Sequence, residues 1–404
     1  MEQIVKHFTD NDLYTFTVQY YILQQYPKAE VRYSFFDRNF THYPEGFGEL
    51  LREQVNNMKD VVITDEEINF MRRKCYFLPE WYFTFLKGYR FNPSEVNIFQ
   101  DSAGHLNITI EGKWFSTVMW EMPILSTISE LMHKLNGDTK KIDLIDEYKR
   151  AYAKAEMLLE NGVNVSEMGT RRRFSFDLQD TVIRTFVDYN EKLTEGRFLG
   201  TSNVYFAMKY NLTPIGTMSH QIISFEENVS GVHECNFAVM NKWAEVYDGN
   251  LGIYLYDCFG DNIFFDNITT KHAKLFDGLR VDSGVNEEQL EKIIEMYKKL
   301  HLDPKHHSVI FSNALNGKTA IEIHKAVKRR MEDSCGMGTW LTCNFDEISG
   351  VPSVDIDASN IVIKLVAMRY TPQRKWLDCV KLSCDKGKTL GNREKCEYLS
   401  KIIM

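Results

Sequence analysis

The chain has 404 residues, with 48 Lys and Arg against 56 Asp and Glu, and its formal net charge is −8 at pH 7. This charge argues against a general affinity for nucleic acid or for an anionic membrane, although a local basic pocket stays possible. Hydrophobic residues make up 44% of the chain and aromatic residues 13%. That content is enough for a large buried core, and the length allows two or three domains.

The sequence predicts a cytoplasmic protein that does not enter a membrane. No stretch reaches the roughly eighteen uninterrupted apolar residues of a membrane span, and the opening MEQ begins no signal peptide. The eight cysteines form no Cys-x-x-Cys pair and no disulfide-framework spacing. We therefore expect reduced thiols. Whether Cys379, Cys384 and Cys396 bind a soft metal stays open, because no clear fourth ligand lies nearby.

The first part of the chain, residues 1–125, mixes helical and strand periodicity and is predicted to be an α+β domain. Residues 11–27 have the apolar spacing of a helix that stops at a proline, and residues 29–36 alternate like a strand. The sequence TDEE predicts a capping box that opens a helix over 64–74. Residues 96–112 contain two strand-like runs around DSAG, which predicts a hairpin.

The middle part, residues 126–345, has a different pattern of predicted helices and strands. A long Ala/Leu/Glu-rich helix begins near Asp146 and ends at Gly162, and seven short apolar strands then alternate with amphipathic helices. A spacing of roughly 16 to 40 residues is typical of β/α repeats in a parallel sheet or barrel. We predict strand ends near Met168, Leu199, Ile215, Leu255, Val281, Phe311 and Gly338.

The residues at these strand ends are those of a phosphate-rich site. The motifs are EMGTRRR, LGTSN, IGTMSH, YDCFGD, LRVDSG, FSNAL and GMGTWL. Glycine lets the backbone approach a ligand, backbone N–H groups at helix starts bind anions, and arginine supplies a bidentate fork. Asp257 and Asp282 would then hold Mg²⁺ or sugar hydroxyls, since both prefer oxygen partners.

Each element taken alone has a simpler explanation. A Gly-Thr step after a strand is usually a turn, and the run Arg171–Arg173 is more often a solvated charge cluster. His220 alone is more often a hydrogen-bonded core or surface histidine, and Asp257 and Asp282 could cap helices. The coincidence of such residues at successive strand ends favours a shared site.

The motifs GTRRRFS, LGTSN, LTPIGTMSH, LRVDSG and GMGTWLTCNFD, in this order, resemble nicotinate phosphoribosyltransferase. The N-terminal TDNDLYTFTVQYY and the late NIVIKLV and VKLS are similar to that family too, so the resemblance covers nearly the whole chain. It implies an α/β fold, with residues 126–345 as an irregular seven-unit β/α barrel of the type II phosphoribosyltransferase kind. Residues 346–404 would pack back on the N-terminal domain.

The resemblance also implies a reaction. Nicotinate would attack C1 of 5-phosphoribosyl 1-pyrophosphate to give nicotinate mononucleotide and pyrophosphate, with Mg²⁺ present and ATP hydrolysis coupled, on the route to NAD. In that family the histidine at the position of His220 is phosphorylated by ATP. A neutral imidazole suits this role because it is nucleophilic near pH 7.

The roles of several other residues follow from their places in these motifs. Arg171 and Arg280 would contact anionic groups of the substrates, and Asp282 would contact ribose hydroxyls. Asp257 would bind Mg²⁺ or orient His220. The remaining substrate-binding residues of these strand ends would be Ser312 and, as a cradle for the 5-phosphate, Gly338 and Thr339.

The pyridine ring would lie against Tyr14, which in that family commonly comes from a neighbouring subunit, so a homodimer is expected. The alternative for Tyr14 is an aromatic residue on the buried face of the first helix. Met168 would pack on the other face of the ring. Ser202 stands where relatives that use nicotinamide carry Asp, and a hydroxyl helped by Arg171 favours the acid over the amide.

Four positions depart from the family pattern. Met168 stands where an aromatic residue is usual, so a thioether would form the second face of the ring site. Gln221 follows His220 where Glu is familiar, Asn313 replaces a usual Asp, and Trp340 replaces a common basic residue. We expect activity with altered ATP or Mg²⁺ coupling.

Two rival functions stay in view. One is a quinolinate or nicotinamide phosphoribosyltransferase. The other is a nucleic-acid contact by Arg171–Arg173 with Phe174 and Phe176, which the net negative charge disfavours.

Overall fold

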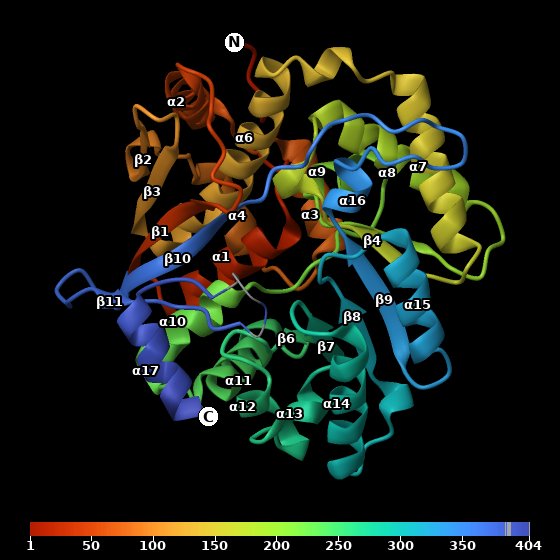
Figure 1. Ribbon diagram of the computed structural model, residues 1–404. Coiled ribbons are helices and arrows are strands. Elements are labelled where there is room, and N and C mark those ends of the chain that lie inside the picture. Colours follow the sequence, from red (N-terminus) through yellow and green to blue (C-terminus); the bar gives the residue numbers. More distant parts are fainter. Residues whose placement is uncertain (384, 386–388, 404) are drawn as a thin grey trace.

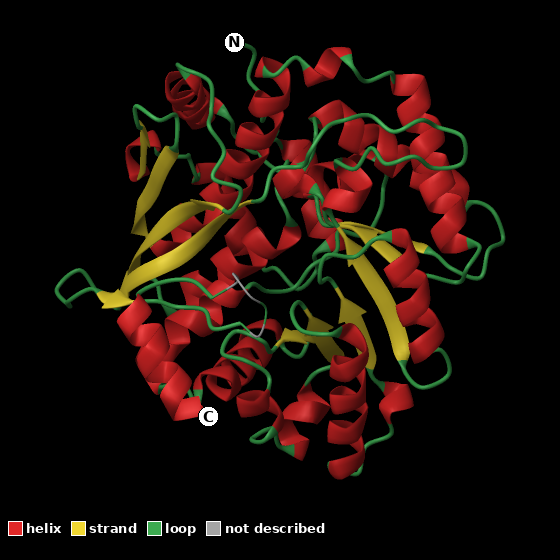
Figure 2. Cartoon of the chain, viewed as in Figure 1, coloured by secondary structure: helices red, strands yellow, loops and turns green. Residues whose placement is uncertain are grey.

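The computed structural model describes residues 1–383, 385 and 389–403. Two sheets organise them, and the helices surround both (Figures 1 and 2). One sheet has five strands in the order β11-β10-β1-β3-β2, and the other has six in the order β5-β4-β9-β8-β7-β6. The α/β class predicted from the sequence is confirmed.

The N-terminal part supplies three strands of the five-stranded sheet. Its predicted first helix, first strand and hairpin are confirmed, and β2 and β3 pair antiparallel. In β1 the buried residues alternate with half-buried ones, as the sequence alternation requires. The elements are α1 Leu13–Gln25, β1 Glu30–Asp37, α2 Phe47–Asn57, α3 Asp65–Lys74, α4 Glu80–Gly88, β2 Val96–Gln100, β3 Leu106–Lys113, α5 Trp114–Thr117 and α6 Glu121–Leu135.

The predicted capping box at the start of α3 is confirmed. The Thr64 hydroxyl accepts from the Glu67 backbone N–H at 3.2 Å, and the Glu67 carboxylate accepts from the Thr64 N–H at 2.7 Å. The same carboxylate also accepts from the backbone N–H of Thr9 at 3.0 Å and from its hydroxyl at 2.5 Å. The cap of α3 therefore also fixes the chain just before α1.

The second sheet is built from parallel strands with helices between them. Its elements are α7 Leu144–Leu159, β4 Val165–Glu167, α8 Phe176–Asn190, β5 Phe198–Thr201, α9 Val204–Lys209, α10 His220–Ser230, α11 Cys235–Tyr247, β6 Ile253–Leu255, α12 Asn262–Phe265, α13 Thr270–Leu275, β7 Gly278–Val281, α14 Asn286–Lys299, β8 Ser308–Phe311, α15 Gly317–Val327, β9 Glu332–Met337 and α16 Thr339–Thr342.

The predicted seven-unit barrel needs a correction: within the described residues the second sheet has six strands, and its edge strands β5 and β6 do not pair. The strand expected near Ile215 is only an isolated bridge between Pro214 and Thr201. Proline has no N–H for a ladder, and Gly216 adopts a φ of 144°. The segment packs on α1 instead, where a Cβ on Gly216 would lie 3.4 Å from the Tyr14 backbone nitrogen.

The C-terminal part crosses between the two sheets. Its elements are β10 Ile361–Arg369, β11 Leu377–Asp378 and α17 Arg393–Ile403. β10 pairs antiparallel with β1 along its whole length, from Glu30 opposite Arg369 to Asp37 opposite Ile361 (Figure 1). Further on, the Leu382 N–H donates to the Cys258 carbonyl at 3.0 Å, in the loop after β6. Residues late in the chain thus contact both halves.

The described cysteines are buried and unpaired, which agrees with the expected reduced thiols. Cys384 lies outside the described residues, so the possible cluster with Cys379 and Cys396 stays open. Among the helices that the structure describes, none is both long and apolar enough to cross a membrane.

Replacing Thr64 by Ala should lower the free energy of unfolding by about 1 kcal/mol, because the cap of α3 is lost. Urea denaturation measures this change. The matched control is Thr84→Ala in α4. The exposed hydroxyl of Thr84 donates to the Glu80 carbonyl of its own helix at 3.2 Å and caps no helix. Equal losses in the two variants would contradict the capping role.

Candidate active site

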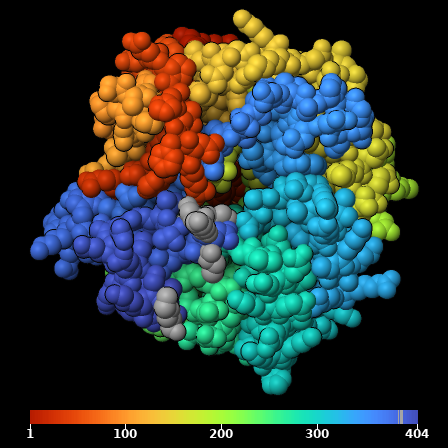
Figure 3. Space-filling view, viewed as in Figure 1, coloured from red at the N-terminus to blue at the C-terminus, as the bar shows by residue number. Residues whose placement is uncertain are grey.

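A cavity of about 1180 Å³ lies between the two sheets and is lined by residues from both. In Figure 3 the red N-terminal, blue C-terminal and cyan segments meet around a hollow at the centre of the face shown. Most of the predicted site residues lie on its wall. They are Tyr14, Met168, Arg171, His220, Arg280, Asp282, Ser312, Gly338 and Thr339.

His220 is the first residue of α10, and its imidazole is held by two neighbours. Nε2 lies 2.8 Å from Oδ1 of Asp257, which follows β6. Oδ2 of Asp257 accepts from the Ser283 hydroxyl at 2.5 Å, so both carboxylate oxygens have protein partners. Lys381 Nζ lies 3.0 Å from the same Nε2. Asp257 itself is buried behind His220 and does not line the cavity.

The surroundings keep the imidazole neutral. Burial lowers the pKa of His220 to about 4, and the charge of Lys381 acts in the same direction. Burial alone would raise the pKa of Asp257, but the contact with His220 and the charge of Lys381 hold it below its usual range. The site thus pairs a neutral imidazole with an ionised carboxylate at neutral pH.

A second carboxylate faces the cavity beside this pair. Asp282 follows β7, and its Oδ1 accepts from the Ser312 hydroxyl at 2.9 Å and from Nη2 of Arg280 at 3.3 Å. Nε of Arg280 donates to Ser312 at 2.9 Å. Burial opposes ionisation of Asp282, but Arg280 holds its pKa below the usual range. Strands β7 and β8 therefore place an ordered Arg-Ser-Asp group on one wall.

On another wall, Tyr14 and Arg171 meet at one carboxylate. The Tyr14 hydroxyl donates to Oε2 of Glu121 at 2.8 Å, and Nη1 of Arg171 lies 3.8 Å from Oε1. Met168 lines the same cavity at the end of β4. Tyr14 reaches this cavity from the chain that also supplies His220, so a neighbouring subunit is not needed to place it there.

The glycine of the GMGT motif allows two strand ends to approach closely. A Cβ on Gly338 would lie 2.8 Å from the carbonyl oxygen of Met168. Any other residue would push β9 away from β4 at the cavity wall. Thr339 then begins the short helix α16 beside it.

Ser202 is placed differently from what its predicted role requires, whereas Gln221 and Asn313, the departures from the family pattern, both line the cavity. Ser202 lies off the cavity wall and donates to Oδ1 of Asp12 at 2.9 Å. The Gln221 amide oxygen accepts from the hydroxyl of Tyr33 at 2.5 Å, so it joins α10 to β1. Asn313 donates to the Gly284 carbonyl at 2.9 Å.

Sequence reasoning gave no role to six cations of the cavity wall, namely Arg38, Lys154, Arg172, Lys318, Lys364 and Lys381. Burial lowers the pKa of Lys364 to about 8 and that of Arg172 to about 9. Lys364 and Lys381 each interrupt an apolar run, NIVIKLV and VKLS, which was a usable signal. Arg38 follows β1 without any such signal.

In the described part of the chain, His220, Asp257 and Asp282 are the group of three that could hold a metal ion, with donor atoms within 4.8 Å of one another. The carboxylate oxygens suit a hard cation such as Mg²⁺. Both carboxylates have protein partners, but Asp282 lines the cavity and Asp257 does not. Asp282 is therefore the better ligand.

Known proteins resemble this chain along most of its length. The nicotinate phosphoribosyltransferase (NAPRTase) family model matches residues 163–399, and the model of the NAPRTase N-terminal domain matches residues 9–129. A nicotinate phosphoribosyltransferase of Desulforapulum autotrophicum is 37% identical over 402 residues, which cover 99% of both chains.

Solved structures show the same likeness. Nicotinate phosphoribosyltransferase from Porphyromonas gingivalis superimposes with a TM-score of 0.91 at 36% identity, covering 99% of this chain and 100% of the other. A putative nicotinate phosphoribosyltransferase from Saccharomyces cerevisiae gives 0.90 at 28% identity, with 100% and 99% coverage. The chain therefore belongs to the nicotinate phosphoribosyltransferase family.

Proposed function

We propose that this enzyme transfers the phosphoribosyl group of 5-phosphoribosyl 1-pyrophosphate to nicotinate. The pyridine nitrogen forms a bond to C1 of the ribose while the bond from C1 to the pyrophosphate oxygen breaks. The products are nicotinate mononucleotide and pyrophosphate. The observation that carries the proposal is one cavity whose walls join the cations of both sheets to the carboxylate of Asp282, in a chain of this family.

The cations have a clear task in this reaction. Pyrophosphate gains negative charge as it leaves, and fixed positive groups in a site of low dielectric stabilise that charge without reorganising. Arg38, Arg172, Lys364 and Lys381 supply them. Asp282 contacts the ribose hydroxyls, and the backbone of Gly338 with the hydroxyl of Thr339 cradles the 5-phosphate.

Nicotinate lies with its ring between Tyr14 and Met168, and Arg171 binds its carboxylate. A guanidinium donates two parallel N–H groups to the two oxygens of a carboxylate, and the opposite charges strengthen both hydrogen bonds. An amide is neutral and has a single oxygen, so it binds the guanidinium more weakly. The preference for the acid therefore depends on Arg171. Ser202 acts indirectly, by donating its hydrogen bond to the buried carboxylate of Asp12.

The coupling to ATP uses His220. An imidazole nitrogen forms a bond to the γ-phosphorus as the bond to ADP breaks, and water later cleaves the P–N bond to release phosphate. The neutral state of His220 supports its role as nucleophile. Asp257 orients the ring, and Lys381 lies where its charge can stabilise the phosphoryl oxygens.

When bound, Mg²⁺ would neutralise part of the charge of the phosphate groups. Its ligands would be Asp282 and oxygen atoms of the substrate. Asp257 is the less favourable ligand, because it is buried behind His220 and does not line the cavity. A homodimer stays a proposal independent of this chemistry, since Tyr14 and His220 of one chain already line one cavity.

Replacing His220 by Ala should abolish the stimulation of product formation by ATP and leave a slow ATP-independent reaction, because the phosphoryl acceptor is gone. Assays of nicotinate mononucleotide with and without ATP measure this. His306→Ala, at an exposed histidine, is the control and should keep the stimulation. Full ATP coupling in the His220 variant would exclude the phosphohistidine.

Arg171→Ala should raise the KM for nicotinate about tenfold to a hundredfold, because a charge-assisted contact is lost. Use of nicotinamide, which carries no carboxylate, should change far less. Steady-state assays with nicotinate, nicotinamide and quinolinate test this, with the exposed Arg184→Ala as control. An equal change for nicotinate and nicotinamide would rule out the carboxylate contact.

Lys381→Met should raise the pKa of His220 above its value of about 4, because a neighbouring positive charge disfavours the imidazolium. NMR titration of histidine-labelled protein measures the midpoint, and Lys298→Met, at an exposed lysine, is the control. A lower or unchanged midpoint in the Lys381 variant would show that this charge does not act on the imidazole.

A further inference from the structure

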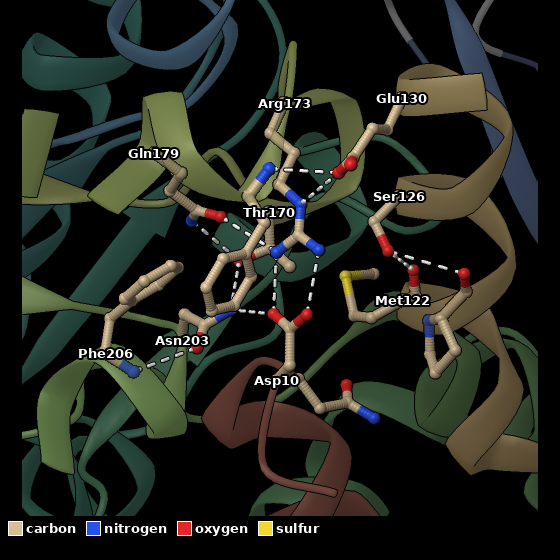
Figure 4. A network of polar contacts seen from close by, with 12 residues as sticks. Asp10, Met122, Ser126, Glu130, Thr170, Arg173, Gln179, Asn203 and Phe206 are labelled. Carbon is tan, nitrogen blue, oxygen red and sulfur yellow. Dashed lines mark hydrogen bonds and ion pairs between the residues drawn. The ribbon is translucent and has the colours of Figure 1, made fainter. Parts of the chain in front are cut away.

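The three consecutive arginines of the GTRRR motif face different surroundings. Arg171 and Arg172 line the cavity, whereas Arg173 is fully buried and does not reach it. Figure 4 shows the Arg173 guanidinium surrounded by polar side chains from several elements. The substrate chemistry described above gives no task to this third arginine.

Arg173 forms a two-point contact with Asp10. Nη1 donates to Oδ1 of Asp10 at 2.7 Å, and Nη2 donates to Oδ2 at 2.8 Å (Figure 4). Both side chains are 0% exposed. Two parallel hydrogen bonds between planar groups fix their orientation as well as their distance. An apolar contact between the same segments would leave that orientation free.

Further hydrogen bonds join a third loop to this pair. Asn203 Nδ2 donates to Oδ1 of Asp10 at 2.7 Å and lies 3.2 Å from the Thr170 hydroxyl. Gln179 Nε2 also donates to Thr170, at 3.1 Å, and its amide oxygen accepts from Arg173 at 3.2 Å. The network thus connects the loops before α1, after β4 and after β5.

Two of these loops carry the residues assigned to the pyridine ring. Tyr14 lies four positions after Asp10, in the first turn of α1, and Arg171 lies two positions before Arg173. At the cavity their side chains meet Glu121, at 2.8 Å and 3.8 Å. The buried network therefore lies close behind the wall that carries Tyr14 and Arg171.

We propose that the Asp10–Arg173 pair is a positioning element of the pyridine site. Neither residue touches substrate. The pair fixes the register of α1 against the loop after β4, and thereby the place of the aromatic ring relative to the carboxylate-binding guanidinium. This inference rests on the proposed roles of Tyr14 and Arg171.

The test uses Asp10→Asn and Arg173→Lys, which keep size or charge but lose the two-point contact. Because small displacements of positioning groups have large kinetic effects, the KM for nicotinate should rise by about tenfold or more. The KM for the phosphoribosyl donor should rise by a much smaller factor, since Arg172 is the one of its proposed cationic contacts on the same loop, whereas Arg38, Lys364 and Lys381 lie on other segments.

Asp333→Asn is the matched control. Asp333 is also buried and paired with a basic residue, His324 at 3.1 Å, but neither of these two lines the cavity. Both Asn variants should lower the melting temperature. Only Asp10→Asn should change the KM for nicotinate, which separates positioning from a general loss of stability.

The double variant Asp10→Leu/Arg173→Met removes both charges of the pair and leaves Glu130, which lies 3.8 Å from Nε of Arg173, paired with Lys134 at 2.7 Å. It should be more stable than either single variant. Its KM for nicotinate should stay raised. A KM at the wild-type value in Arg173→Lys or in the double variant would overturn the positioning role. Arg171→Ala is assayed alongside: if it too leaves the KM for nicotinate unchanged, the proposed pyridine site is wrong, and otherwise only the positioning role fails.

Discussion

The pairing of β1 with β10 is the interaction on which the site depends, because it brings cations from distant segments to one cavity. Arg38 follows β1, Lys364 lies on β10, and Nε of Arg172 donates to the carbonyl of Ile361 at the start of β10 at 3.1 Å. Burial lowers the pKa of both Lys364 and Arg172, so these charges are held where solvation is poor. A ladder of backbone hydrogen bonds can hold them there, which isolated loops could not.

The six-stranded sheet contributes the complementary half. The loops on its cavity side bring donor atoms of His220, Asp257 and Asp282 within 4.8 Å of one another, and the helix that begins at His220 is joined to β1 through Gln221 and Tyr33. Cations from both sheets together with the carboxylate of Asp282 form an arrangement that suits a sugar carrying a phosphate and a pyrophosphate group. The buried Asp10–Arg173 network lies behind this cavity and connects the loops that carry Tyr14 and Arg171.

Local patterns allowed much of this to be predicted. The capping box at Thr64, the hairpin of β2 and β3 and the ends of most parallel strands follow from residue type and periodicity. The strand near Ile215 was wrong because contact with α1 outweighs its local β preference, as the close approach at Gly216 shows. Ser202 was expected at the ligand, but its hydrogen bond to Asp12 depends on a segment 190 residues away. The cations Lys364 and Lys381 were missed although each interrupts an apolar run, whereas Arg38 has no such signal and reaches the cavity only because of where β1 ends.

A crystal structure with nicotinate and an unreactive analogue of the phosphoribosyl donor tests the central claim most directly. The account predicts the pyrophosphate group among Arg38, Arg172, Lys364 and Lys381, and the pyridine ring between Tyr14 and Met168 of one chain. A donor bound outside this cavity, or a ring held by the tyrosine of another chain, would contradict it.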